Sequence, residues 1–231
     1  MGGDPTLILA PAGFGTTTLV TEWATGKNGF IAWLSLDEAD NDPVRFWRYI
    51  VASLRTVFEE TGQEVIALLE SEQVSDWESL ITLLINDISN VSNAFTLVLD
   101  DYHLIRANAI HSSLSFLLHH QPSQLHVIII TRADPPLALA RLRVQGRLWD
   151  IRAADLRFSE SEMEAFFDCA VTAKLPVETF KALTEHTEGW AAGLQLAALS
   201  LRGLPAAEAT RSVMAFDGAQ RYVLNYMLEE V

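Results

Sequence analysis

The sequence predicts an α/β fold: a three-layer parallel β-sheet with helices on both faces, followed by a small all-α helical domain. Two observations support this fold class. Short apolar runs alternate with amphipathic helical patterns over residues 6–151, as in a parallel sheet whose strands are joined by helices. After residue 157, four helical patterns follow with no strand-like run between them. We therefore expect a sheet domain at residues 1–156 and a helical domain at 157–216.

The first apolar run, residues 6–9, leads through a turn with two glycines directly into a helical pattern. This strand–loop–helix arrangement is typical of P-loop NTPases. Gly13 and Gly15 can adopt a positive φ without steric cost, which lets backbone N–H groups approach a phosphate closely. The helix that begins near Thr16 directs unpaired N–H groups at the same anion, and the Thr17 hydroxyl stands where the motif has a magnesium ligand. The loop residues expected to bind nucleotide are Ala12, Gly13, Phe14, Gly15, Thr16, Thr17 and Thr18.

One position departs from the motif G-x-x-x-x-G-K-[ST], because Thr16 stands in the place of the lysine. Loss of a charge-assisted hydrogen bond worth about 1.5–3 kcal/mol should weaken triphosphate binding roughly ten- to 150-fold. Hydrolysis should suffer more, because such a lysine stabilises charge that develops in the transition state. Taken alone, the stretch also fits an ordinary Gly-containing turn between a strand and a helix.

The next segments continue the alternation of strands and helices. Residues 30–36 predict a strand that is buried on both faces, and residues 37–43 predict a solvated acidic loop that includes a helix N-cap. A helix opened by Asp42 or Pro43 follows, and another amphipathic helix is expected from Asp76 to about residue 91. Residues 59–75 show a mixed pattern.

An apolar strand from residue 95 ends in two adjacent carboxylates, Asp100 and Asp101. Two like charges at a strand end repel each other unless a cation lies nearby. We interpret Asp100 as a ligand of Mg²⁺, directly or through water, and Asp101 as the catalytic residue that orients or activates water. The alternative is a pair of solvated acids that cap the next helix. His103 is expected to be a polar residue at the loop edge and no metal ligand.

A further buried strand at residues 125–130 is followed by Arg132. In a parallel sheet, this arginine lies at the same edge as the glycine turn and Asp100, where ligands bind. We therefore expect Arg132 to bind nucleotide by contacting a γ-phosphate; pairing with Asp134 at the surface is the alternative. Beyond it, the sequence predicts a short helix at 137–142 and a last strand at 148–151.

The helical domain is predicted to begin with a capping box formed by Ser159 and Glu162. Its helices are expected around residues 160–170, 176–187, 189–201 and 205–215. The single cysteine, Cys169, lies in an amphipathic pattern and is expected to be buried.

The chain of 231 residues has a formal net charge of −14, which disfavours direct contact with nucleic acid or an anionic membrane. With 49% hydrophobic residues it can bury a substantial core. One cysteine excludes an intrachain disulfide, and no apolar run approaches the length of a membrane span. We expect a cytoplasmic protein with no membrane partner.

Six motifs, in order along the chain, resemble those of STAND-class P-loop ATPases, in particular the large ATP-binding LuxR-type regulators related to the maltose activator. Together they form a specific signal, whereas each alone is weak. They are APAGFG at 10–15 with TTL at 17–19, AWLSLDEADNDP at 32–43, LVLDDYH at 97–103, TRADPP at 131–136, RAADLRF at 152–158, and EGWAAGLQLA at 188–197.

The resemblance implies a switch that binds ATP and ADP with Mg²⁺, in which the ATP-bound form self-associates. It implies the sheet order of additional-strand P-loop ATPases. It assigns Thr17 and Asp100 to magnesium, Asp101 to catalysis and Arg132 to the γ-phosphate. It also implies that residues 193–196 approach the nucleotide. Residues 217–231 would begin a winged-helix domain, and the family's C-terminal sensor and promoter-binding helix-turn-helix regions are absent from this sequence.

From these observations we expect part of a longer protein: the nucleotide-binding regulatory switch module of a LuxR-type ATP-dependent transcriptional regulator. The substitution at Thr16 predicts impaired nucleotide binding and weak or absent hydrolysis. The alternative function is a pseudo-ATPase interaction scaffold that binds no nucleotide.

Overall fold

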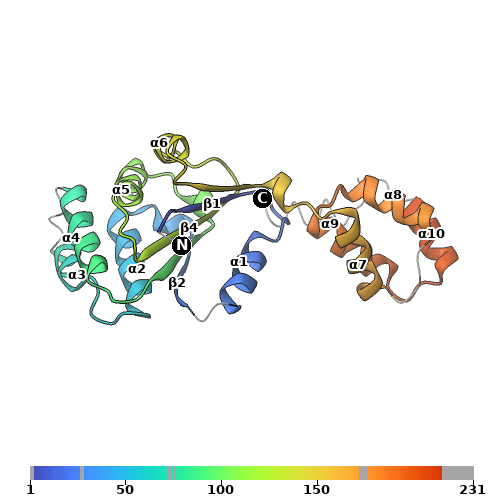
Figure 1. The fold of residues 1–231 in the computed structure, drawn as a ribbon, viewed down its shortest axis with the longest axis horizontal. Helices are drawn as coiled ribbons and strands as arrows, with labels where there is room; N and C mark the ends of the chain where they lie inside the picture. The colour runs from blue at the N-terminus through green and yellow to red at the C-terminus, as the bar shows by residue number, and fades with distance from the viewer. Residues whose placement is uncertain (1–2, 27–28, 72–73, 75, 172–175, 215–231) are drawn as a thin grey trace. The chain divides into compact units, whose positions relative to one another are not determined.

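The computed structural model describes residues 3–26, 29–71, 74, 76–171 and 176–214, which form two compact units (Figure 1). We call the first the sheet unit; it consists of the described residues up to Ala10 and from Thr16 to Arg152. We call the second the helical unit; it consists of the loop segment Pro11–Gly15 and the described residues from Ala153 onward.

The sheet unit contains a parallel sheet with the strand order β2-β3-β4-β1-β5. All pairings between these strands are parallel. Strand β4 lies between β1 and β3, which is the order that the resemblance implies and which confirms the α/β fold. The strands are β1 (Thr6–Leu9), β2 (Phe30–Ser35), β3 (Phe95–Asp100), β4 (Leu125–Thr131) and β5 (Trp149–Arg152).

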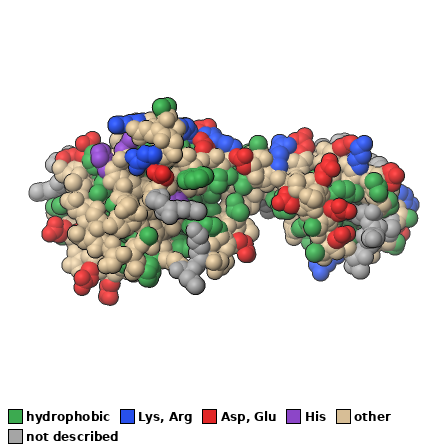
Figure 2. All heavy atoms as spheres, in the orientation of Figure 1, with side chains coloured by type: hydrophobic (Ala, Val, Ile, Leu, Met, Phe, Trp, Pro, Cys, Tyr) green, Lys and Arg blue, Asp and Glu red, His purple; other side chains and the backbone are tan. Residues whose placement is uncertain are grey.

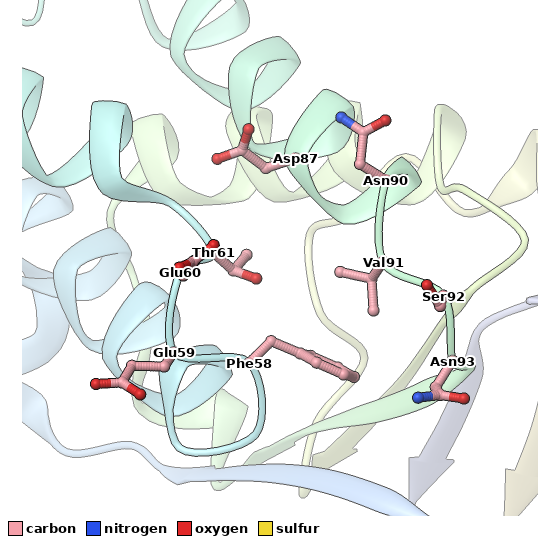
Figure 3. A pocket seen from close by; sticks show the side chains of 9 residues that line it. All are labelled: Phe58, Glu59, Glu60, Thr61, Asp87, Asn90, Val91, Ser92 and Asn93. Atoms are coloured by element: carbon pink, nitrogen blue, oxygen red, sulfur yellow. The ribbon is translucent and has the colours of Figure 1, made fainter.

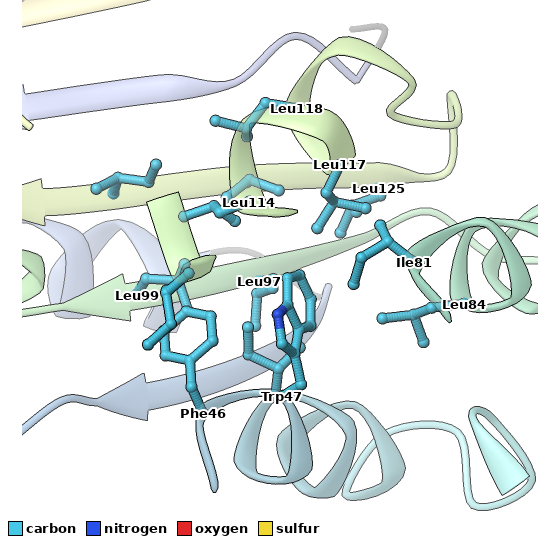
Figure 4. Close-up of a cluster of buried hydrophobic side chains, with 14 of the residues drawn as sticks. Phe46, Trp47, Ile81, Leu84, Leu97, Leu99, Leu114, Leu117, Leu118 and Leu125 are labelled. Atoms are coloured by element: carbon cyan, nitrogen blue, oxygen red, sulfur yellow. The ribbon is translucent and has the colours of Figure 1, made fainter. Parts of the chain in front are cut away.

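Helices cover both faces of the sheet. One face packs against α2, α4 and α5, whose apolar side chains interdigitate with those of β3 and β4 (Figure 4). The opposite face carries α1, where the ring of Trp23 meets His126 of β4 edge-on at a centroid distance of 6.2 Å. The helices and 3₁₀ turns of this unit are α1 (Thr16–Thr25), η1 (Glu38–Asn41), α2 (Pro43–Arg55), α3 (Gln63–Glu70), α4 (Trp77–Ser89), η2 (Tyr102–Leu104), α5 (Asn108–His119) and α6 (Ala140–Val144).

Trp47 is the largest side chain of this core that is fully buried. Its indole Nε1–H donates a hydrogen bond to Ser113 Oγ at 3.0 Å, which ties α2 to α5. Phe46 lies against the indole ring edge-on, with ring centroids 5.5 Å apart. The core is therefore centred on the packing of α2 and α5 over β3.

Strand β2 is not buried on both faces, so the prediction for residues 30–36 is wrong in this respect. Ala32 is its one fully buried residue, and Phe30 is 45% exposed. The reason is topological, because β2 lies at the edge of the sheet and pairs with β3 alone.

The acidic loop is ordered by its own carboxylates. Asp37 caps η1, and the backbone N–H of Arg45 donates to Asp42 Oδ1 at 2.7 Å, which confirms the N-cap of α2. Asp40 is 2% exposed, so the expectation of a solvated loop is wrong there. The Arg45 guanidinium compensates this buried charge by donating from Nε to Asp40 Oδ1 at 2.8 Å.

Two other segments differ from their predicted structure. The mixed segment contains the helix α3, and the short helix predicted at residues 137–142 is displaced towards the C-terminus as α6. Pro135 and Pro136 precede this helix, and the N–H of Leu137 bonds within a turn to the carbonyl of Pro135 at 2.7 Å. The helix therefore begins only after this proline-containing turn.

The helical unit has a hydrophobic core of its own. The Ser159–Glu162 capping box is present, as predicted. Cys169 is exposed, so its expected burial is wrong: Met163 and Phe167 form the buried face of this helix, and Cys169 lies off that face. The proposed winged-helix start at 217–231 lies outside the described residues. The unit contains η3 (Ala153–Leu156), α7 (Glu160–Ala170), α8 (Val177–Thr187), α9 (Ala191–Leu201) and α10 (Ala206–Met214).

Within the described residues, no helix combines the length and the apolar character needed to span a membrane. Acidic side chains are spread over the visible face of the molecule, and several of the basic ones gather near α6 (Figure 2). The basic residues in and beside that helix are Arg141, Arg143 and Arg147.

Candidate functional site

The carboxyl ends of β1, β3 and β4 meet at one edge of the sheet. Leu9 pairs with Thr131, and the N–H of Ala10 donates to the carbonyl of Thr131 at 3.2 Å just beyond the paired strands. Asp100 ends β3, the strand on the other side of β4. This edge therefore brings together the segments in which the sequence places the magnesium ligands, the catalytic acid and Arg132.

Thr17 and Asp100, 83 residues apart in the chain, lie side by side in the sheet unit. The Thr17 hydroxyl donates to Asp100 Oδ2 at 3.1 Å. Asp100 is 3% exposed, and burial raises the pKa of its carboxyl, as does the neighbouring charge of Asp101. The hydrogen bond from Thr17 and the charge of Arg132 act in the opposite direction. The two predicted magnesium ligands are thus joined by a direct hydrogen bond, in which the buried Asp100 carboxylate is the acceptor.

Asp101 has a left-handed backbone conformation with φ of 57°. Its N–H donates to Asp100 Oδ1 at 3.0 Å, so the backbone turns sharply directly after the strand. Its side chain is 43% exposed. The two acids therefore have different environments: one is buried beside Thr17, and the other is accessible to water.

His103 lies beside the second acid. Its Nδ1 is 3.8 Å from Asp101 Oδ1, and this buried nitrogen makes no hydrogen bond within the described residues. Burial lowers the pKa of His103, and the charge of Arg132 lowers it further. From the sequence, His103 was expected to lie at the loop edge without a functional role. A single histidine after a strand belongs to no repeating pattern or motif that would indicate its neighbours.

Arg132 is close enough to this group of residues for its charge to act on both Asp100 and His103. Asp134, its expected alternative partner, lies beside two further arginines of the sheet unit. Arg152 Nη1 lies 3.0 Å from Asp134 Oδ2, and Arg143 Nη2 lies 3.7 Å from Asp134 Oδ1. Contact of Arg132 with a γ-phosphate stays a prediction, as does its pairing with Asp134.

The loop segment Pro11–Gly15 contains the predicted glycine conformations. Gly13 has φ of 79° and Gly15 has φ of 72°, both in the left-handed region. The segment packs within the helical unit. There the Trp190 Nε1–H donates to the carbonyl of Ala12 at 3.1 Å, and the N–H of Ala192 donates to the carbonyl of Gly13 at 2.9 Å.

Within the helical unit, the loop is thus contacted by residues just before the 193–196 segment that the resemblance implied. Gly193 lies under the Trp190 ring: a Cβ at this position would stand 2.8 Å from Trp190 Cε3. Trp190 and Ala192 were missed as contact residues. The glycine-rich motif around them was the available signal, since glycines often mark a close approach of backbone and side chain.

A separate pocket of about 480 Å³ lies away from these residues, where the loop after α2 meets the end of α4 (Figure 3). Acidic and amide side chains surround it, together with the ring of Phe58. The residues that line it are Phe58, Glu59, Glu60, Thr61, Asp87, Asn90, Val91, Ser92 and Asn93. None of the predicted site residues belongs to this set.

Replacing Asp100 with asparagine should raise the melting temperature of the nucleotide-free protein at about pH 8. The raised pKa of Asp100 means that the folded state binds this proton more tightly than the unfolded chain does. The stabilisation that this tighter proton binding gives is fully present below the pKa of Asp100 in the unfolded chain. It is lost as pH rises through the pKa of Asp100 in the folded state, and above that pKa the buried carboxylate destabilises the fold. The gain from Asp100→Asn should therefore shrink at lower pH, as differential scanning fluorimetry in magnesium-free buffer would show. A variant that melts below the wild type at every pH would contradict the expected electrostatic cause.

Comparison with known proteins gave matches over nearly the whole chain. The chain is 36% identical over 228 residues to the HTH-type transcriptional regulator MalT of Serratia proteamaculans (strain 568), covering 98% of this chain and 25% of that protein. It is 37% identical over 227 residues to the MalT protein of Yersinia enterocolitica, again covering 98% of this chain and 25% of the relative. The chain therefore spans about a quarter of the length of the curated relatives it matches.

No protein-family model matches the sequence. Among solved structures, the Aeropyrum pernix ORC1 protein in complex with DNA matches 92% of this chain and 59% of its own. The TM-score is 0.45 and the sequence identity is 11%, so this similarity supports no conclusion about the chain.

Proposed function

The chain is homologous over 98% of its length to about a quarter of the MalT transcriptional regulators, and from that relationship we propose that it is a nucleotide-binding regulatory module of such a protein. The observation that carries the proposal is the contact between Thr17 and Asp100, with the Thr17 hydroxyl 3.1 Å from the carboxylate. A hydroxyl that follows a glycine turn and a buried carboxylate that ends another strand of the same sheet are the groups expected to supply the two magnesium ligands of a phosphate-binding site.

The proposed ligand is ATP or ADP with Mg²⁺. The residues fit the metal, since a hydroxyl and a carboxylate supply hard oxygen ligands and a cation would compensate the buried charge of Asp100. When bound, Mg²⁺ neutralises phosphate charge. Thr17 and Asp100 would hold this ion, Asp101 would orient water, and Arg132 would contact the γ-phosphate. The remaining proposed contacts to phosphate come from Ala12, Gly13, Phe14, Gly15, Thr16 and Thr18.

Impaired nucleotide binding is part of the proposal, because Thr16 provides no cation to the phosphates. The left-handed glycines and the N-terminus of α1 can still supply backbone N–H groups. Arg132 is a planar guanidinium at another position and does not reproduce the geometry of the missing lysine. We therefore propose weak nucleotide binding with weak or absent hydrolysis.

As a module of a longer regulator, the chain would act as a switch. ATP and ADP differ in the γ-phosphate, so a group such as Arg132 can give the two ligands different affinities for two conformations. Self-association of the ATP-bound form, a sensor region and promoter binding by a helix-turn-helix region belong to this proposal for the longer protein.

The first experiment measures the melting temperature with and without Mg-ADP and Mg-ATP, on the wild type and on Thr16→Lys. Ligand at 100 times its dissociation constant should stabilise the folded state by about 2.7 kcal/mol, which is a readily measured shift. A shift in both proteins supports a nucleotide switch, and a shift in Thr16→Lys alone supports a site disabled at this position. No shift in either protein contradicts the proposal and favours the interaction scaffold.

Replacing Asp101 with asparagine should abolish any steady-state ATP hydrolysis while leaving the dissociation constant of Mg-ADP within about threefold. The exposed carboxylate can accept a proton from water, whereas the amide cannot. The measurement is phosphate release together with calorimetric titration. Asp168→Asn, a change in α7 of the helical unit, is the matched control and should hydrolyse ATP like the wild type. Unchanged hydrolysis in Asp101→Asn would remove this residue from the catalytic role.

A further inference from the structure

The loop segment Pro11–Gly15 is held by its carbonyl groups. The Ala12 carbonyl accepts a hydrogen bond from Trp190 Nε1 at 3.1 Å, and the Gly13 carbonyl accepts one from the Ala192 N–H at 2.9 Å. Both donors lie in the same unit as the loop but 178 or more positions away from it in the chain. Two consecutive peptide groups of the loop are thus fixed by one short segment.

Fixing these carbonyls also fixes the N–H groups on the other side of the same peptides. Each peptide bond is planar, and none of the described peptide bonds is cis. The N–H of Gly13 therefore points away from Trp190, and the N–H of Phe14 points away from Ala192. Among the described residues, neither N–H donates one of the backbone hydrogen bonds formed outside helices and strands. Both groups are free of such bonds on the side opposite the helical contact.

Glycines give this contact its close fit. A Cβ at Gly13 would stand 2.7 Å from the Ala192 Cβ and 2.8 Å from Trp190 Nε1, so a side chain at this position would break the contact. A Cβ at Gly193 would stand 2.8 Å from Trp190 Cε3. The indole is thus packed between Gly13 and Gly193, and a larger residue at either position would have to displace it.

The backbone before Trp190 is fixed as well. Gly189 has φ of 74°, and its carbonyl accepts a hydrogen bond from the N–H of Phe158 at 3.0 Å. The N–H of Trp190 donates to the carbonyl of Thr187 at 2.8 Å, and the Arg157 guanidinium contacts the Glu188 carboxylate at 2.8 Å. The indole is therefore presented from an ordered turn between α8 and α9.

We propose that Trp190 and the Ala192 amide are positioning groups for phosphate binding: by holding the Ala12 and Gly13 carbonyls, they direct the N–H groups of Gly13 and Phe14 towards the phosphate chain of a nucleotide. Such a preformed pair of donors binds an anion without having to reorganise first. The inference rests on the proposed nucleotide binding. It adds that the helical segment at residues 188–193 determines the phosphate affinity of a loop from which it is distant in sequence.

The test is calorimetric titration of Mg-ADP and of magnesium pyrophosphate into the wild type and Trp190→Phe, each with and without Thr16→Lys. Phenylalanine keeps an aromatic ring but removes the donor to Ala12. Loss of one hydrogen bond that orders the loop should weaken both ligands about two- to tenfold. Trp149→Phe, at a side chain of β5 that is 65% exposed, is the matched control and should bind like the wild type.

A spectroscopic readout separates positioning from a general loss of stability. The chain has six tryptophans, and the indole N–H resonance missing from the spectrum of Trp190→Phe identifies Trp190. This resonance should exchange slowly with solvent and should shift when magnesium pyrophosphate is added. Titration is done well below the melting temperature of every variant, so that a lower melting temperature alone leaves the affinity unchanged.

These experiments distinguish a failure of the positioning role of Trp190 from a failure of the proposed nucleotide binding. Equal affinities of the wild type and Trp190→Phe, in a protein that binds the ligands, would overturn the inference and leave nucleotide binding intact. Absence of binding in all variants, including those with Thr16→Lys, would overturn both. Weaker binding of both ligands in Trp190→Phe, with an unchanged Trp149→Phe, would support the positioning role.

Discussion

Replacing Thr16 with lysine should tighten binding of Mg-ATP by roughly ten- to 150-fold, the equivalent of one charge-assisted hydrogen bond of about 1.5–3 kcal/mol. Thr16 is the first residue of α1 and follows the left-handed Gly15 directly. The ammonium group of a lysine there can reach the β- and γ-phosphates, which the threonine hydroxyl cannot. The gain should be larger for ATP than for AMP, because AMP lacks those phosphates.

The measurement is calorimetric titration of Mg-ATP and AMP into both proteins. Thr25→Lys is the matched control, since it adds the same charge to the exposed last residue of the same helix. It should change the ATP affinity by less than about twofold, because salt screens exposed charges at that distance. Equal gains from Thr16→Lys and Thr25→Lys would show that net charge, and not contact with the phosphates, sets the affinity.

Replacing Trp47 with alanine should lower the free energy of unfolding of the sheet unit by about 3–5 kcal/mol. The indole is fully buried between α2 and α5, packs against Phe46 and donates to Ser113 Oγ at 3.0 Å. Alanine removes this apolar contact, leaves a cavity among side chains that cannot all close over it, and deprives Ser113 Oγ of a donor.

Urea unfolding followed by circular dichroism measures this loss. Trp47→Phe is the matched variant, because it keeps much of the apolar volume and removes the hydrogen bond to Ser113. It should cost only about 1–2 kcal/mol. A loss below about 1 kcal/mol for Trp47→Ala would mean that the packing of α2 against α5 contributes little to the stability of the sheet unit.

The position of each site segment on the sheet was predictable from the sequence, because strand periodicity and chain direction are local properties. Apolar runs that end in Asp100 and in Thr131 place both residues at carboxyl ends of parallel strands, and a parallel sheet brings such ends to one edge. Ala10, which follows the first strand, lies at the same edge. The contact between Thr17 and Asp100 follows from this topology.

Burial and partner choice were less predictable. The apolar run in β2 indicated burial on both faces, yet the strand lies at the sheet edge, since strand order depends on contacts that the local pattern does not encode. Asp40 is buried because Arg45 can pair with it across one turn, and Cys169 is exposed because its helix turns another face inward. In each case the tertiary structure, and not the local sequence pattern, determined whether the residue is buried or exposed.

The sequence by itself determined the α/β class, the helix caps, the left-handed glycines of the loop and the sheet edge that carries Asp100 and Asp101. These features depend on residues close together in the chain, where steric limits and hydrophobic period act directly. Only the tertiary structure decided that His103 lies beside Asp101 with a buried Nδ1, and that Trp190 reaches the carbonyl of Ala12. Such contacts depend on how the finished elements pack, and no periodicity along the chain records which distant side chain will meet a given backbone group.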